Sequence, residues 1–175
     1  MSDFEKQKKR IKSLAENGEP DEALAHCNAL LAELPESKAE ILRLRAYVYA
    51  HRGMYEEAIV DRETLISSGN GILRDYYQLG DNSVSAGRFA DASKWFHEVL
   101  RRGADQNETW FDSAALLLLA YAQMRLGRLQ EAAQYLEKAA AIDPECAMPV
   151  RGEGIVTHQS LRDEIRRLDG NAASR

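Results

Sequence analysis

The chain has 175 residues, a length typical of a single domain, and 45% of its residues are hydrophobic while 29% are charged. This balance is that of a globular protein and excludes a chain that is disordered throughout. The formal net charge of −5 argues against nonspecific binding to nucleic acid, because such binding needs a basic face that displaces counterions.

The sequence favours a cytoplasmic protein that makes no membrane contact. Its charged beginning lacks the apolar stretch of a secretory signal, and its longest apolar run, residues 114–122, is too short to span a bilayer. Cys27 and Cys146 lie far apart in the sequence, so a disulfide framework is not expected. We expect Cys27 to be a small buried residue.

A glycine that is followed five residues later by an alanine occurs four times along the chain. The glycines are Gly18, Gly53, Gly87 and Gly127, at intervals of 35, 34 and 40 residues. A repeat of about 34 residues is typical of stacked units that each contain a helix A, a turn and a helix B. The sequence therefore predicts four such units in one domain that comprises residues 1–175. The units are expected at residues 4–38, 39–72, 73–112 and 113–146.

The units differ in how clearly they show the pattern. Helix A of the first unit is highly charged, as expected for a terminal repeat with one face in water. The third unit is the clearest, with apolar residues at helical spacing over residues 74–86 and a second helix predicted over residues 89–101. Gly87 ends the first of these helices, and Ala92 lies where the two helices should approach closely.

An insertion at residues 104–113 precedes the fourth unit and contains Trp110 and Phe111. We expect both aromatic residues to begin helix A of the fourth unit and to pack on the third. The alternative is that they form a functional edge, because insertions in repeat proteins often lie on a binding face.

The repeat pattern stops after Pro144. Two glycines, a proline and a methionine predict a loop, namely Met148, Pro149, Gly152 and Gly154. A single apolar stripe then predicts a C-terminal helix at about residues 155–169. We expect this helix to cap the stack, and the alternative is a helix that docks a partner or a second copy of the chain.

Together these units resemble the tetratricopeptide repeat family. The third unit carries the resemblance best, through Leu79-Gly80, Gly87, Ala92 and Phe96. The second unit departs from the family pattern with Arg62, at a position that usually has an apolar or aromatic residue. The resemblance covers most of the chain and implies an all-α fold, a right-handed α-solenoid of stacked helix-turn-helix repeats.

In this family helices A line a concave groove, and the resemblance implies where the groove residues lie. They should fall thirteen, ten, six and two residues before each turn glycine. Tyrosine and arginine, which often anchor interfaces, are frequent at these positions. The residues expected to bind a partner are Arg43, Tyr47, His51, Arg74, Tyr77, Asp81, Tyr121 and Arg125.

The sequence contains no pattern that predicts catalysis. No two histidines have the helical spacing of metal ligands, and there is no Cys-x-x-Cys pair, phosphate-binding glycine loop or nucleophile elbow. We therefore expect no enzymatic activity, no metal and no cofactor.

The leading functional hypothesis is a noncatalytic protein–protein interaction module that binds a partner polypeptide in the groove, as a monomer or weak dimer. One alternative is an immunity-type inhibitor of a bacterial toxin, because the acidic balance suits a basic target. Another alternative is a dedicated secretion chaperone.

Overall fold

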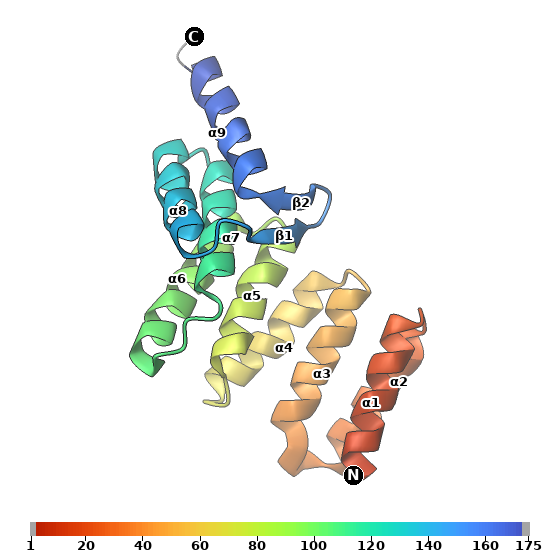
Figure 1. Cartoon of the computed structure of the whole chain (residues 1–175). Coiled ribbons are helices and arrows are strands. Elements are labelled where there is room, and N and C mark those ends of the chain that lie inside the picture. Colours follow the sequence, from red (N-terminus) through yellow and green to blue (C-terminus); the bar gives the residue numbers. More distant parts are fainter. Residues whose placement is uncertain (1–2, 173–175) are drawn as a thin grey trace. The chain divides into compact units, whose positions relative to one another are not determined.

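The computed structural model describes residues 3–172 of the chain (Figure 1). The chain divides into two compact units. Unit 1 is Met1–Asp75 and unit 2 is Tyr76–Arg175. The division falls inside one helix, α5 (Leu73–Ser85), whose first three residues belong to unit 1.

Unit 1 contains two helical hairpins, each of which has a helix A, a short turn and a helix B. Its elements are α1 (Asp3–Glu16), α2 (Pro20–Glu33), the short 3-10 helix η1 (Pro35–Ser37), α3 (Lys38–His51) and α4 (Tyr55–Ser67). Helix α1 packs on both α2 and α3, and α3 packs on α4. Pro20 and Pro35 each stand at the start of a helix, where the missing N–H of proline has no helical partner to lose.

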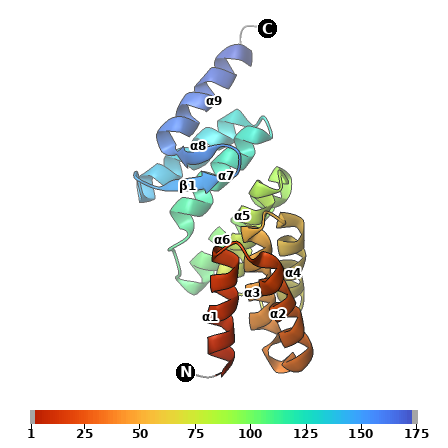
Figure 2. The same cartoon turned by 90° about the vertical axis from the view of Figure 1, so that its right-hand side faces the viewer.

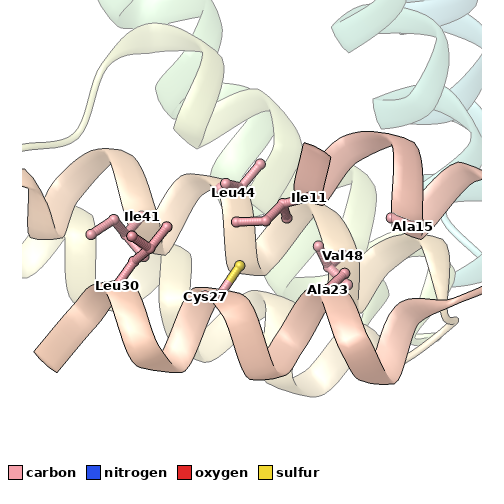
Figure 3. Close-up of a cluster of buried hydrophobic side chains, with 8 residues drawn as sticks. All are labelled: Ile11, Ala15, Ala23, Cys27, Leu30, Ile41, Leu44 and Val48. Atoms are coloured by element: carbon pink, nitrogen blue, oxygen red, sulfur yellow. The ribbon is translucent and has the colours of Figure 1, made fainter. Parts of the chain in front are cut away.

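The core of the first repeat lies among α1, α2 and α3 (Figure 3). Ile11, Cys27 and Ile41 are completely buried in it, one from each helix. The burial of Cys27 confirms that this cysteine is a small core residue. Burial also raises the pKa of the Cys27 thiol to about 12, because the thiolate would be poorly solvated there.

The four turn glycines adopt the conformation that the repeat pattern predicts. Gly18, Gly53, Gly87 and Gly127 all have positive φ angles, between 76° and 84°. A residue with a Cβ is strained in this left-handed region, which explains why glycine recurs at the turn. The alanines that follow five residues later are Ala23, Ala58, Ala92 and Ala132, and all four have 0% exposure. The predicted helix–turn–helix register is therefore confirmed.

Unit 2 contains the remaining repeats and a C-terminal extension. After α5 its elements are α6 (Phe89–Gln106), α7 (Asp112–Arg125), α8 (Leu129–Ile142), β1 (Ala147–Val150), β2 (Gly154–Thr157) and α9 (His158–Ala172). Helix α7 packs on α6 and α8, and α9 packs on α8. Helix α7 is buried along most of its length, from Ala115 to Met124.

The insertion before the fourth unit places its two adjacent aromatic residues in different environments. Helix α6 runs on to Gln106, and Asn107 ends it with a φ of 56° in the left-handed region. Phe111 precedes α7 and stacks on Tyr77, with ring centroids 4.7 Å apart. Trp110 is instead 80% exposed. The expectation of packing on the third repeat is thus right for Phe111 and wrong for Trp110.

The loop expected around residues 148–154 is wrong, because most of this segment forms an antiparallel β-hairpin. Met148 pairs with Val156, and Val150 pairs with Gly154. Gly152 and Gly154 have φ angles of 81° and 79°, so the two glycines make the tight reversal rather than an irregular loop. Strand β1 packs on α7, and Figures 1 and 2 both show the hairpin beside this helix.

The C-terminal helix begins at His158, three residues later than expected, because the residues before it belong to β2. Thr157 and Ser160 fix this start: the Ser160 amide donates to the Thr157 hydroxyl, and the Thr157 amide donates to the Ser160 hydroxyl. Leu161 and Ile165 are buried, which places the predicted apolar stripe in the interior.

Candidate functional site: the faces of helices A

In unit 1, the positions expected to line a groove contact one another from one helix A to the next. The Lys8 ammonium on α1 lies 2.7 Å from the Glu40 carboxylate on α3 and 2.8 Å from Glu5. We call the surface of these positions the A-helix face of unit 1. Its members on α1 and α3 are Glu5, Lys8, Lys12, Glu16, Glu40, Arg43, Tyr47 and His51.

Tyr47 is the centre of this face. Its hydroxyl donates a 2.8 Å hydrogen bond to Glu16, and the Lys12 ammonium lies 5.9 Å from the centroid of its ring. The His51 ring is 4.3 Å away, one helical turn along α3. Burial, and then the hydrogen bond to Glu16, raise the pKa of Tyr47 to about 12. The tyrosine is therefore neutral at physiological pH and presents a partly buried ring between a cation and an imidazole.

Arg43 on the same face is held by a buried carboxylate. Its Nε donates a 2.9 Å hydrogen bond to Asp75, whose side chain is only 1% exposed. The Arg62 guanidinium also reaches Asp75, at 3.4 Å. This pairing explains how an arginine is tolerated at the usually apolar position 62, because its charge is matched inside the unit. Arg43 therefore has a structural role in addition to any contact with a partner.

Two further predicted positions differ in exposure. Arg74, at the start of α5, is exposed, while Asp81 in the middle of α5 is partly buried.

In unit 2, the two predicted groove tyrosines are buried. Tyr77 is 6% exposed and Tyr121 is 3% exposed, which an open groove does not predict. The Tyr77 hydroxyl lies 3.9 Å from the sulfur of Met148 on β1, and its ring contacts Phe111 and Phe96. Burial raises the pKa of Tyr77. The β-hairpin thus contacts this helix A through Met148.

Tyr121 and Arg125, on α7, both contact the turn of the hairpin. The Arg125 guanidinium donates a 2.9 Å hydrogen bond to Glu153 and a 2.6 Å hydrogen bond to the Tyr121 hydroxyl. The Tyr121 hydroxyl in turn donates to Glu153 at 3.3 Å. Phe89 completes the cluster, since the Arg125 guanidinium lies 4.7 Å from the centroid of its ring.

The sequence singled out the residues on helices A of this cluster but not the hairpin residues that contact them. Met148 and Glu153 lie in the segment that was expected to be a loop, and nothing in their spacing indicates that they face Tyr77 and Arg125. The only available signal was the pair Gly152 and Gly154, which is compatible with a hairpin turn as well as with a loop.

The described residues contain no group of three or more histidine, cysteine, aspartate or glutamate side chains that could hold a metal ion. Within the same part of the chain, no helix is both long and apolar enough to cross a membrane. The clusters on helices A combine aromatic rings, guanidinium groups and carboxylates.

Several solved structures share this fold. A tetratricopeptide repeat protein from Parabacteroides merdae matches with a TM-score of 0.75 at 13% identity, over 96% of this chain and 60% of that one. The chain thus spans less than two thirds of that protein's length. Putative kinesin light chain TPR-like repeats of Podosopora anserina match with a TM-score of 0.67 at 18% identity, over 97% and 96% of the two chains. MamA from Desulfovibrio magneticus matches with a TM-score of 0.67 at 19% identity, over 100% and 98%.

A comparison with curated protein sequences gave no match. The sequence profile of the Tetratricopeptide repeat family, in contrast, matches residues 9–65 and 77–145, which is more than half of the chain. These two stretches contain all four of the Gly–Ala turns whose register the structure confirms. The chain therefore belongs to the tetratricopeptide repeat family.

Proposed function

We propose that this protein is a noncatalytic interaction module that binds an extended segment of a partner polypeptide along the faces of its helices A. The observation that carries the proposal is that residues at predicted groove positions on the two helices A of unit 1 contact one another. Lys8 meets Glu40, and Glu16 meets Tyr47, so neighbouring helices A present one continuous strip of side chains. A strip of this kind suits a segment that crosses several helices.

The chemistry of the strip favours recognition by aromatic and cationic side chains. Tyr47 offers a ring whose position is fixed by neighbours, so little side-chain entropy is lost when a partner packs on it. Lys12 and His51 beside it are exposed. A partner segment with a carboxylate and an apolar side chain would be chemically complementary to these groups.

The test is the affinity of a partner for a Tyr47→Ala variant, after the partner has been captured from native lysate with the wild-type chain. Tyr47 is only partly buried, but its ring packs against the core of unit 1, so the fold of the variant is first verified by circular dichroism. Loss of an interface tyrosine commonly costs about 2 kcal/mol, so the dissociation constant should rise roughly thirtyfold. Alanine at Tyr77 or Tyr121 is a poorer test, because both are buried and would leave cavities.

Tyr135→Ala is the matched control. Tyr135 is also partly buried and also contacts a histidine, since its hydroxyl lies 2.8 Å from His97, but it is on α8, a helix B. This variant should bind the partner like the wild type. If Tyr47→Ala folds and keeps full affinity while Tyr135→Ala loses it, the partner binds helices B and the proposal is wrong.

An immunity-type inhibitor and a secretion chaperone are special cases of the same binding function. The identity of the captured partner distinguishes them. A basic toxin domain would favour the inhibitor, to which the net charge of −5 is suited, and a component of a secretion apparatus would favour the chaperone.

A further inference from the structure

The β1–β2 hairpin lies on the surface that the repeat pattern assigns to a partner. In unit 2, three of the predicted binding residues contact the hairpin, namely Tyr77, Tyr121 and Arg125. In unit 1, by contrast, Tyr47 is partly exposed and His51 is exposed. The difference is confined to the unit that carries the C-terminal extension.

The contacts of the hairpin are those expected of a bound peptide. Glu153 supplies a carboxylate that accepts hydrogen bonds from the Arg125 guanidinium and the Tyr121 hydroxyl. Met148 supplies a thioether to the hydroxyl of Tyr77. One acidic and one apolar side chain thus fill the cationic and the aromatic parts of the surface.

The polar contacts that hold the hairpin are easy to break. The ion pair between Arg125 and Glu153 is exposed to solvent on both sides, with 40% and 48% of the two side chains accessible, so it contributes little to stability. The hairpin has only four residues in each strand, and a two-stranded sheet of this size is marginal without support. Val150 and Val156 are the buried residues of the hairpin, and their apolar burial supplies the rest of its stabilisation.

We propose that the β1–β2 hairpin is an internal competitor for the unit 2 binding surface, and that a partner segment with a carboxylate and an apolar side chain displaces it. The inference rests on the proposed function of helices A and adds its regulation: unit 2 is closed in the free protein and opens when the partner takes the place of Glu153 and Met148. Because only the open molecules can bind, the apparent affinity of unit 2 for its partner is reduced in proportion to the open fraction.

The first test uses the segment itself as the probe. A fluorescently labelled peptide with the sequence of residues 147–157 is titrated into the wild-type chain and into a full-length variant whose residues 147–157 are replaced by a glycine–serine linker of equal length. Fluorescence anisotropy should show binding to the linker variant, and binding to the wild type should be at least about tenfold weaker because the tethered hairpin competes at high effective concentration. A peptide with Gln in place of Glu153 should bind more weakly than the natural sequence.

Two results would overturn the inference. The linker variant, with wild-type helicity by circular dichroism, could fail to bind the peptide, or it could bind a scrambled peptide equally well. In either case the hairpin is a fixed part of the fold and not a replaceable ligand.

A second variant covers the possibility that the linker variant does not fold. Glu153→Gln in the full chain removes only the exposed ion pair, so hydrogen exchange of the β1 and β2 amides should accelerate roughly two- to fivefold while the α7 amides keep their rates. If the hairpin and α7 amides instead exchange at one common rate in the wild type and the variant, the hairpin does not open independently and the inference is wrong.

These tests are separate from the test of the proposed function. Neither of them needs the partner, whereas the Tyr47→Ala measurement does not depend on the hairpin. Loss of partner binding in Tyr47→Ala together with failure of the peptide to bind would leave the function standing and reject the competitor. The reverse combination would reject helix A of unit 1 as the partner site and retain the competitor.

Discussion

A methyl group added at position 80 would collide with the Phe96 ring, and Gly80→Ala therefore tests the packing of helix A on helix B in the third repeat. A Cβ at this position would lie 2.7 Å from Cε1 of Phe96 and 2.9 Å from Cδ1 and Cζ. Carbon atoms in favourable contact are about 3.5–4.0 Å apart, so the ring or the helix must move by roughly 0.8 Å or more. Phe96 is fully buried, so its ring cannot relieve the collision by turning into solvent.

Two opposing effects set the magnitude. Overpacking of a dense core costs about 1–3 kcal/mol, while replacing glycine by alanine inside a helix contributes about 0.5–1 kcal/mol of stability. The net expectation for Gly80→Ala is a loss of up to about 2.5 kcal/mol in the free energy of unfolding. For a chain of this length that corresponds to a fall in melting temperature of about 2–4 °C per kcal/mol.

The assay is urea unfolding followed by far-UV circular dichroism, with Gly170→Ala as the matched control. Gly170 is also helical, but a Cβ there meets no heavy atom within 4 Å, so this variant should be neutral or slightly stabilising. Adding Phe96→Leu should relieve the collision, and the cost of Gly80→Ala should shrink in that background. If Gly80→Ala stabilises the protein as much as Gly170→Ala does, α5 and α6 do not pack as described.

Three further outcomes follow from buried and charged residues. Ala92→Leu should lower the free energy of unfolding in urea by about 1–3 kcal/mol, because Ala92 has 0% exposure and a larger side chain would overpack the helix contact. An unchanged urea midpoint would contradict the repeat register. A thiol reagent at pH 8 should label Cys146 quickly and Cys27 only on unfolding, because Cys27 is buried and its pKa is raised to about 12; equal rates would refute this. The hydrogen bond from Arg101 lowers the pKa of Glu98 to about 2. Glu98→Gln should therefore lower the free energy of unfolding by up to about 1 kcal/mol above pH 4.5, and the difference from the wild type should fade as the pH falls toward 2. A difference that does not change with pH would contradict the pairing.

The repeat architecture could be predicted from the sequence because each of its signals is local. A positive φ at Gly87 and close helix contact at Ala92 are requirements of one turn and one helix pair, so they recur at a fixed spacing. The same regularity places Tyr47 on the face of its helix, and the contacts with Glu16 and Lys12 follow from stacking successive units. For these features a pattern in the sequence is sufficient.

Features that depend on distant partners could not be predicted. The strands around Met148 and Glu153 are short, and their support comes from α7, which lies more than twenty residues earlier in the chain. Arg62 breaks the apolar pattern, and its charge partner Asp75 lies on the next helix. Trp110 and Phe111 are neighbours of similar chemistry, and only the position of Tyr77 determines which of them is buried.

Site-specific photocrosslinking tests the A-helix face most directly. A benzophenone amino acid is placed singly at three exposed positions: His51 on α3, Trp110 in the loop before α7, and Arg166 on α9. Each variant is irradiated with the captured partner, and the crosslinked product is quantified on gels. We expect a strong partner crosslink from position 51 and little from positions 110 and 166. A strong crosslink from position 110 or 166 with none from position 51 would show that the partner binds the loop edge or the C-terminal helix and not helices A.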